Sequence, residues 1–187
     1  SNALLVFETI NNRGMDLQDA DIFKAKLYYM SLSVGKGEEF KEQWKNLISR
    51  CDDLDLKIDD LFRYYYHIIR GKEGIVIAEK RLREFFQKDP KSPFKTGGYE
   101  IVLDDLQKTL DAIEEYYYKR TEPTRLGAWL QVLDAYTNQN PVYALIVFLY
   151  FNKDTTEDVL IEFLKKVVRY CYYKGSTMSV KFEIYNI

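Results

Sequence analysis

The chain has 187 residues, 27 basic and 29 acidic side chains, and a net charge of −2. Hydrophobic residues make up 47% and charged residues 30%, a balance typical of a globular protein and not of a disordered one. The near-neutral charge excludes a strong global attraction to DNA or acidic membranes, although a local basic patch is still compatible with it. No apolar run reaches the ~18 residues of a membrane span, so no membrane association is expected.

Both ends of the sequence predict short extended segments. Ser1-Asn2-Ala3 has the character of a cleaved expression tag and is left out of the fold reasoning. Residues 4–10 form an apolar run, and Asn11-Asn12-Arg13-Gly14 follows with residue types that favour a tight turn. Val180, Phe182 and Ile184 alternate as in a strand. We therefore expect the chain to be a piece of a longer protein, cut at both ends.

Between these ends, hydrophobic periodicity predicts a series of helices. Apolar residues recur at helical spacing from Leu17 to Met30 and from Leu160 to Cys171, and Thr155 with Asp158 resembles a capping box before the second run. Prolines make residues 88–98 the clearest loop. We predict about eight helices in a mainly α, multi-helix bundle with one or two short terminal strands. They are expected at residues 18–33, from 38, 61–71, 75–87, 99–119, 126–136, from 141 and from 156.

The sequence shows no repeat and no domain boundary after the turn at Gly14, so residues 17–187 are expected to form one helical domain. Cys51 and Cys171 have no CxxC spacing and are interpreted as buried, reduced thiols. His67 is the only histidine and lies in a Tyr-Tyr-Tyr-His-Ile-Ile run, which favours a structural role. The absence of other histidines excludes a His-Asn-His nuclease centre and histidine-rich metal sites.

Tyrosines cluster at residues 64–66, 116–118 and 172–173. Three consecutive residues cover about 200° of a helix, so no triplet is expected to be wholly buried. Two of the clusters have basic neighbours, and aromatic rings among basic side chains suit nucleic-acid contact by stacking and phosphate pairing. The alternative is packing, with the hydroxyl groups at the surface. The candidate nucleic-acid-binding residues are Lys119, Arg120, Arg125, Lys165, Lys166, Arg169 and Lys174.

The stretch from Phe7 to Asp21 predicts a strand, a glycine turn and a helix start. Such junctions can present amide groups and backbone N–H groups to a phosphate, and Asn11 and Arg13 have the appropriate chemistry. A purely structural interpretation is equally open, in which the asparagines stabilise the turn and Asp16 or Gln18 caps the helix.

Phe7, Asn11 and Leu17 fit the pattern FxxxNxxxxxL, and Asp21 supplies an acidic residue four positions later. This pattern, with Ile22 to Leu27 after it, resembles the N-terminal, ParB-like domain family of GmrSD-type restriction systems, long catalogued as a domain of unknown function. The match covers about 20 residues. By this resemblance residues 4–16 would be the last strand and turn of a truncated ParB-like core, and Phe7, Asn11 and Asp21 would lie with Arg13 at the edge of a nucleotide pocket.

The resemblance implies a bacterial, cytoplasmic protein that acts in phage defence against modified foreign DNA. Its ParB-like core would bind and hydrolyse a nucleoside triphosphate with magnesium, and a His-Asn-His nuclease domain or subunit would be its partner. The helices would then recognise DNA, relay the nucleotide state or form a homodimer interface. The alternative is a helical protein–protein interaction or DNA-binding module of an unrelated family.

The departures from the family are also informative. The signature Asp-Gly-Gln-Gln-Arg, which the family carries upstream, is missing, as are the nuclease histidines. A site built from several motifs cannot work with one of them. We therefore expect no catalytic residue, no cofactor and no NTPase or nuclease activity in this chain, and place those activities in the full-length protein.

Overall fold

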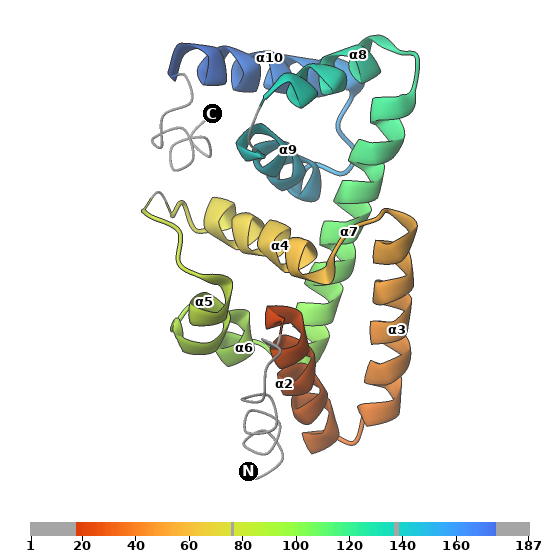
Figure 1. The fold of residues 1–187 in the computed structure, drawn as a ribbon, viewed down its shortest axis with the longest axis vertical. Helices are drawn as coiled ribbons and strands as arrows, with labels where there is room; N and C mark the ends of the chain where they lie inside the picture. The colour runs from red at the N-terminus through yellow and green to blue at the C-terminus, as the bar shows by residue number, and fades with distance from the viewer. Residues whose placement is uncertain (1–17, 76, 137–138, 175–187) are drawn as a thin grey trace. The chain divides into compact units, whose positions relative to one another are not determined.

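The computed structural model describes residues 18–75, 77–136 and 139–174, so the predicted terminal strands lie outside the described residues. Within these ranges the protein is helical, with nine α-helices and one 3₁₀ turn (Figure 1). The prediction of a mainly α, multi-helix bundle is confirmed. The chain divides into two compact units, the first made of residues 1–62 and 80–105 and the second of residues 63–79 and 106–187.

The first unit has an aromatic core. The Phe23 ring lies 4.8 Å from Phe62, 5.0 Å from Phe86 and 5.5 Å from Phe94, between ring centroids. These side chains come from four helices, so one ring cluster joins them. The elements of this unit are α2 (Asp19–Ser33), α3 (Gly37–Asp53), the first turn of α4 (Ile58–Lys72), α5 (Leu82–Lys88), α6 (Pro93–Thr96) and the start of α7 (Tyr99–Thr121).

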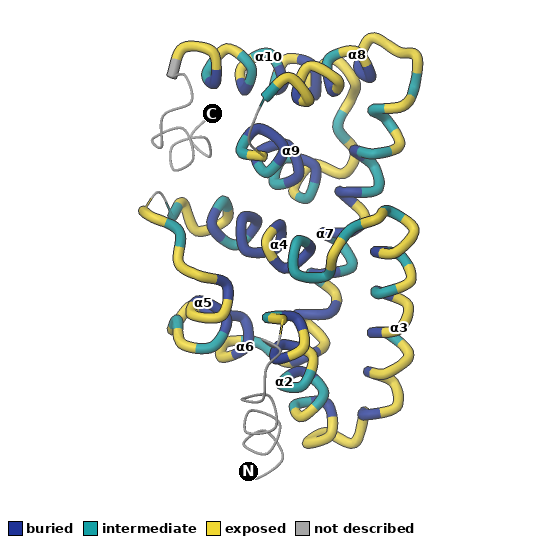
Figure 2. The backbone as a smooth tube through the Cα atoms, viewed as in Figure 1, coloured by how far each residue is buried: buried dark blue, intermediate teal, exposed yellow. Residues whose placement is uncertain are grey.

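Helices α2 and α3 lie side by side, and α3 shows how the sequence selects its buried face (Figure 1). Phe40, Trp44, Leu47 and Cys51 recur at four, three and four residues and are all buried. Apart from the half-buried Ile48, the residues between them are polar and mostly exposed, so buried and exposed positions alternate along the helix (Figure 2). This is the expected pattern of a helix that packs by one stripe.

The second unit has an aliphatic core. Leu110, Leu145, Leu160, Leu164 and Val167 are fully buried, with no exposed surface. Helix α10 packs against both α8 and α9. The elements of this unit are the rest of α4 and α7, α8 (Arg125–Val132), η2 (Leu133–Ala135), α9 (Asn140–Phe151) and α10 (Glu157–Lys174). No helix in the described part of the chain has the length and apolar character needed to cross a bilayer.

Two helices are capped at their N-termini by carboxylates from other helices. The Ala20 N–H in the first turn of α2 donates to Asp59 Oδ1 of α4 over 2.7 Å. The Leu126 N–H in the first turn of α8 donates to Glu157 Oε1 of α10 over 3.1 Å. A carboxylate at a helix N-terminus satisfies a free N–H and opposes the positive end of the helix dipole. These caps therefore join each helix start to a distant part of the chain.

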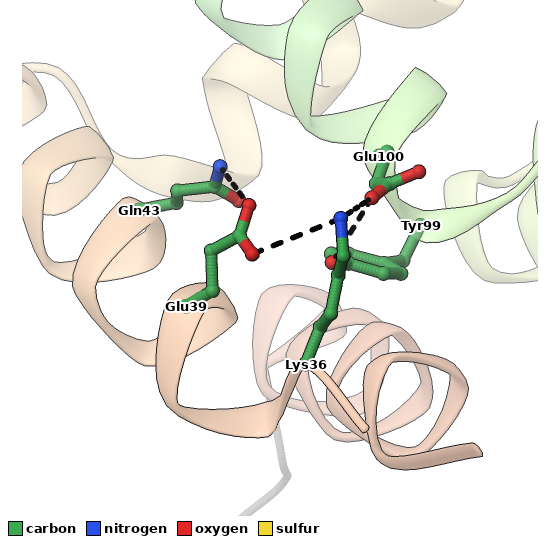
Figure 3. A network of polar contacts seen from close by, with 5 residues as sticks. All are labelled: Lys36, Glu39, Gln43, Tyr99 and Glu100. Carbon is green, nitrogen blue, oxygen red and sulfur yellow. Dashed lines mark hydrogen bonds and ion pairs between the residues drawn. The ribbon is translucent and has the colours of Figure 1, made fainter. Parts of the chain in front are cut away.

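A surface network ties the α2–α3 connection to the start of α7 (Figure 3). Lys36 Nζ lies 2.6 Å from Glu100 Oε1 and 3.8 Å from Glu39 Oε2. The bond to Glu100 raises the pKa of Lys36, and the same bond lowers the pKa of Glu100. The side chains are largely exposed, so the network fixes local geometry more than it contributes to stability.

Three local predictions were wrong. A helix was expected from residue 75 to residue 87, but α5 starts only at Leu82, and residues 77–81 are not helical. At Ile77 the backbone carbonyl accepts from the buried Arg70 side chain over 2.6 Å, which favours a non-helical path there. The expected loop at 88–98 contains α6, whose first turn is capped by Ser92 accepting from the Phe94 N–H. The residue that caps α10 is Thr156, not Thr155, since the Val159 N–H donates to its hydroxyl.

Candidate functional site

The predicted edge of a nucleotide pocket is only partly described. Phe7, Asn11 and Arg13 lie outside the described residues. Asp21 is exposed in the first turn of α2, and that helix begins at Asp19, close to the residue where the sequence predicted its start. A nucleotide site formed by these four residues stays a prediction. Asp21 is the one of them whose surroundings the structure describes.

The start of α2 is acidic. Asp59 already accepts the Ala20 N–H, so that donor is not open to a phosphate. Burial raises the pKa of Asp59, and the nearby carboxylates of Asp19, Asp60 and Asp21 raise it further, while the bond from Ala20 lowers it. A phosphate placed at this helix terminus would meet several carboxylates. The expectation that the helix start itself binds phosphate is therefore disfavoured by its charge.

A groove between α2 and α3, which we call the lysine groove, opens beside Asp21. It has a volume of about 670 Å³ and is lined by Asp21, Lys24, Ala25, Tyr28, Phe40, Lys41, Trp44, Lys45 and Ile48. The Lys24 ammonium lies over the Trp44 ring, 6.0 Å from its centroid, so a cation faces this aromatic side chain. Three lysines against one aspartate make this groove cationic. It is the described feature best suited to an anionic ligand.

Sequence reasoning missed the lysine groove. Lys24 on α2 and Lys41 and Lys45 on α3 are far apart in the sequence and become neighbours only when the two helices pack. The one local signal was the spacing of Lys41 and Lys45, which places them one turn apart on the same face. Lys41 is partly neutralised, since its ammonium lies 2.7 Å from Glu38 Oε1.

The first predicted basic cluster is largely neutralised by carboxylates. Lys119 Nζ lies 2.6 Å from Glu115 Oε1 on the same helix. Arg120 donates from Nε and Nη2 to Asp134 Oδ2 over 3.1 and 2.7 Å, and this bond raises its pKa. Arg125 lies 3.8 Å from Asp158 with both side chains well exposed. Paired cations offer less charge to a phosphate than free ones.

The second predicted basic cluster lies along α10 and is only partly paired. Lys165 Nζ lies 2.6 Å from Glu162 Oε1. Lys165 lowers the pKa of Glu162, and Arg125 and Arg169 lower it further, so this carboxylate sits among several cations. Lys166 and Arg169 are exposed, while the side chain of Lys174 lies outside the described part. The structure thus brings Arg125 of the first cluster close to the α10 cluster.

The tyrosine triplets differ from one another, which the helical-wheel argument did not predict. Tyr64, Tyr65 and Tyr66 are all buried, against the expectation. The reason is that this part of α4 is covered on several sides, by the Tyr143 ring 5.1 Å from Tyr64 and by the Arg70 guanidinium 5.4 Å from Tyr66. In the other clusters Tyr118, Tyr172 and Tyr173 are exposed, as a stacking role would require.

The single histidine and the two cysteines are buried. His67 stacks on Tyr143 at 3.9 Å between ring centroids, and its Nε2 lies 3.1 Å from Glu79 Oε1, which agrees with a structural role. Cys51 and Cys171 are buried and form no disulfide, as the sequence predicted. Burial raises the pKa of Cys171 to about 11, so its thiol stays protonated and unreactive near neutral pH.

A second groove, which we call the apolar groove, lies between α9, α10 and the end of α4. Its volume is about 800 Å³, and its lining is Gly71, Lys72, Ala144, Val147, Phe148, Phe151, Asn152, Asp158, Val159, Glu162, Phe163 and Lys166. Phe148 and Phe163 stack in it at 4.1 Å between ring centroids. This lining suits the apolar side chains of a protein partner better than a phosphate.

The described residues contain no group of three or more His, Cys, Asp or Glu side chains placed to hold a metal ion. The magnesium implied by the family resemblance is therefore not assigned to any of them. The fold and these grooves define the class of protein as a mainly α, multi-helix protein. No family model matches the chain, and no curated protein or solved structure does either.

Proposed function

We propose that the chain is the helical part of a nucleotide-dependent, DNA-targeting restriction protein and that it is not catalytic by itself. The observation that supports this most is the continuity of the motif with α2. The pattern of Phe7, Asn11 and Leu17 leads directly into a helix that starts at Asp19, and Asp21 stands exposed on its first turn. An exposed side chain in that position is accessible to a ligand.

The lysine groove offers a binding surface for the phosphate groups of a nucleotide or of DNA. Asp21 lines this groove together with Lys24, Lys41 and Lys45. Ammonium groups beside Asp21 would attract a phosphate of nucleotide or DNA, and they lie on the helices that follow the motif. The two predicted basic clusters make a weaker case for DNA contact, since four carboxylates offset much of the charge of α7, α8 and α10.

The test is nucleotide hydrolysis by the full-length protein that contains this chain, comparing wild type with Asn11→Ala and Asp21→Asn. We expect each variant to reduce the rate by at least about tenfold, the usual order for the loss of a positioning contact. Asp52→Asn is the matched control, because Asp52 is also an exposed helical aspartate but lies outside the motif. Circular dichroism should show unchanged helix content in all three.

Equal hydrolysis rates in wild type, Asn11→Ala and Asp21→Asn would remove these residues from the nucleotide site. A full-length protein that neither hydrolyses nucleotides nor carries Asp-Gly-Gln-Gln-Arg upstream of Leu4 would overturn the proposal as a whole. Its nuclease partner, cytoplasmic location and role in phage defence depend on the same resemblance and would be withdrawn with it.

The second candidate function is a helical protein–protein interaction module of unrelated origin. The apolar groove favours it, since an accessible groove with a stacked phenylalanine floor is typical of a surface that receives another protein. This candidate predicts no nucleotide dependence at all. The hydrolysis experiment therefore separates the two.

A further inference from the structure

The apolar groove leaves large side chains in contact with solvent. Phe151 at the end of α9 is 48% exposed and Val159 at the start of α10 is 52% exposed. Beside them, Phe148 and Phe163 form the stacked pair and are only half-buried. Contiguous exposed apolar surface between two helices of a folded unit is more typical of an interface than of a free surface.

The charges in the lining have both signs in equal number. Lys72 and Lys166 supply two ammonium groups, and Asp158 and Glu162 supply two carboxylates. Among the described residues neither lysine has a carboxylate within ion-pair distance, and Asp158 is highly exposed with only a long contact to Arg125. Glu162 accepts from Lys165 over 2.6 Å. The lining thus has no net charge but retains partly unpaired groups of each sign.

The equal number of positive and negative side chains limits which partner can bind in the apolar groove. A strongly acidic ligand such as a nucleic acid would place phosphates against Asp158 and Glu162, and a strongly basic segment would meet Lys72 and Lys166. In a two-fold pair each surface meets an inverted copy of itself, so a surface that carries both signs can match every cation with an anion of the other copy. We propose that two copies of the chain pair through their apolar grooves.

The arrangement of α10 fits such a pair. Val159, Phe163 and Lys166 are separated by four and three residues, so they lie on one stripe of the helix. Glu162 lies four residues before Lys166, so the two side chains are neighbours on the same face of the helix. Two antiparallel copies of α10 would place the phenylalanine and valine side chains in contact and bring Lys166 of each copy toward Glu162 of the other. This pairing needs neither nucleotide nor DNA and does not depend on the proposed function.

The experiment is sedimentation of the intact chain over a range of concentrations. The wild type should show a reversible monomer–dimer equilibrium. Val159→Asp should raise the dimer Kd at least about tenfold, because the carboxylate would be buried at an apolar contact. Ile101→Asp is the matched control, since Ile101 is an equally exposed aliphatic residue on a helix outside the groove. It should leave the dimer Kd unchanged.

Charge reversal provides the test of symmetry. Glu162→Lys and Lys166→Glu should each weaken the dimer, although they change the net charge in opposite directions, and the double variant should recover most of the affinity. Three outcomes would overturn the proposal: a wild-type chain that is monomeric throughout, a dimer insensitive to Val159→Asp, or a double variant that binds no better than the single ones.

Discussion

At the scale of single residues, Gly127 shows how closely the backbone packs at the start of α8. An added Cβ there would lie 2.1 Å from the Glu122 carbonyl oxygen and 3.1 Å from that of Lys119. Both atoms belong to the backbone and cannot move aside as a flexible side chain can. The Gly127 N–H also donates to the Thr124 hydroxyl over 3.0 Å, so the residue is held by the N-terminal cap of its helix.

We therefore expect Gly127→Ala to destabilise the protein by about 3 kcal/mol, at the upper end of overpacking effects. Urea unfolding followed by circular dichroism measures the difference. Gly98→Ala is the control, because a Cβ at Gly98 meets no atom within 4 Å, and it should change stability by no more than about 1 kcal/mol. Similar losses in both variants would contradict the packing argument.

At the scale of elements, the cap of α2 by Asp59 combines a favourable hydrogen bond with an unfavourable charge. The carboxylate accepts the Ala20 N–H, but burial and the neighbouring aspartates raise its pKa. A raised carboxyl pKa means that the folded state binds the proton more tightly than the unfolded state. Its contribution to stability is present below the unfolded pKa and is lost as the pH rises through the folded pKa.

We expect Asp59→Asn to keep the acceptor oxygen and remove the charge. This variant should be at least as stable as wild type at neutral pH, and its stability should depend less on pH in the acidic range just above the ordinary aspartate pKa. Asp59→Ala loses the cap itself and should cost about 1 kcal/mol. The measurement is chemical unfolding at several pH values. A large loss for Asp59→Asn at neutral pH would show that the ionised carboxylate is favourable there.

The helices themselves could be predicted because their signals are local. The apolar stripe of α3 and the long pattern of α7 are set by neighbours three and four residues away, and their starts were found within one or two residues. The non-helical path at Ile77 could not be predicted, because its carbonyl accepts from the Arg70 side chain of the preceding helix. The prediction that Tyr64, Tyr65 and Tyr66 would not all be buried was wrong for the same reason. The side chains that pack over this triplet come from elsewhere in the chain.

The candidate sites could likewise be predicted only where they depend on residues close together in the sequence. Asp21 was predicted from a motif of nearby residues, and the structure places it on an exposed first turn. The lysine groove and the apolar groove are each made by helices that are distant in sequence, so no spacing rule shows them. The basic clusters could be recognised in the sequence from their lysines and arginines. Their neutralisation could not, because the carboxylates that pair with Arg120 and Arg125 come from other elements.

At the scale of the whole molecule, two helices contribute to both compact units. Helix α4 begins in the first unit and continues in the second, and α7 does likewise. A helix propagates cooperatively, so melting one part of it removes support from the rest. Two of the boundaries between the units therefore fall inside helices that the structure describes.

We expect both units to unfold in one transition. Trp44 lies in the first unit and Trp129 in the second, so each tryptophan can report on one of them. In Trp129→Phe the remaining fluorescence follows the first unit, and in Trp44→Phe it follows the second. Within each variant the fluorescence and far-UV circular dichroism midpoints should coincide. Separate midpoints would show that α4 or α7 breaks between the units.

The carboxylate caps have a consequence for synthesis of the chain. The first turn of α2 leaves the ribosome 39 residues before Asp59, and that of α8 leaves 31 residues before Glu157. Until then the carboxylates that accept from the Ala20 and Leu126 amides have not been synthesised. The caps of these two helices can therefore form only after later residues have been added.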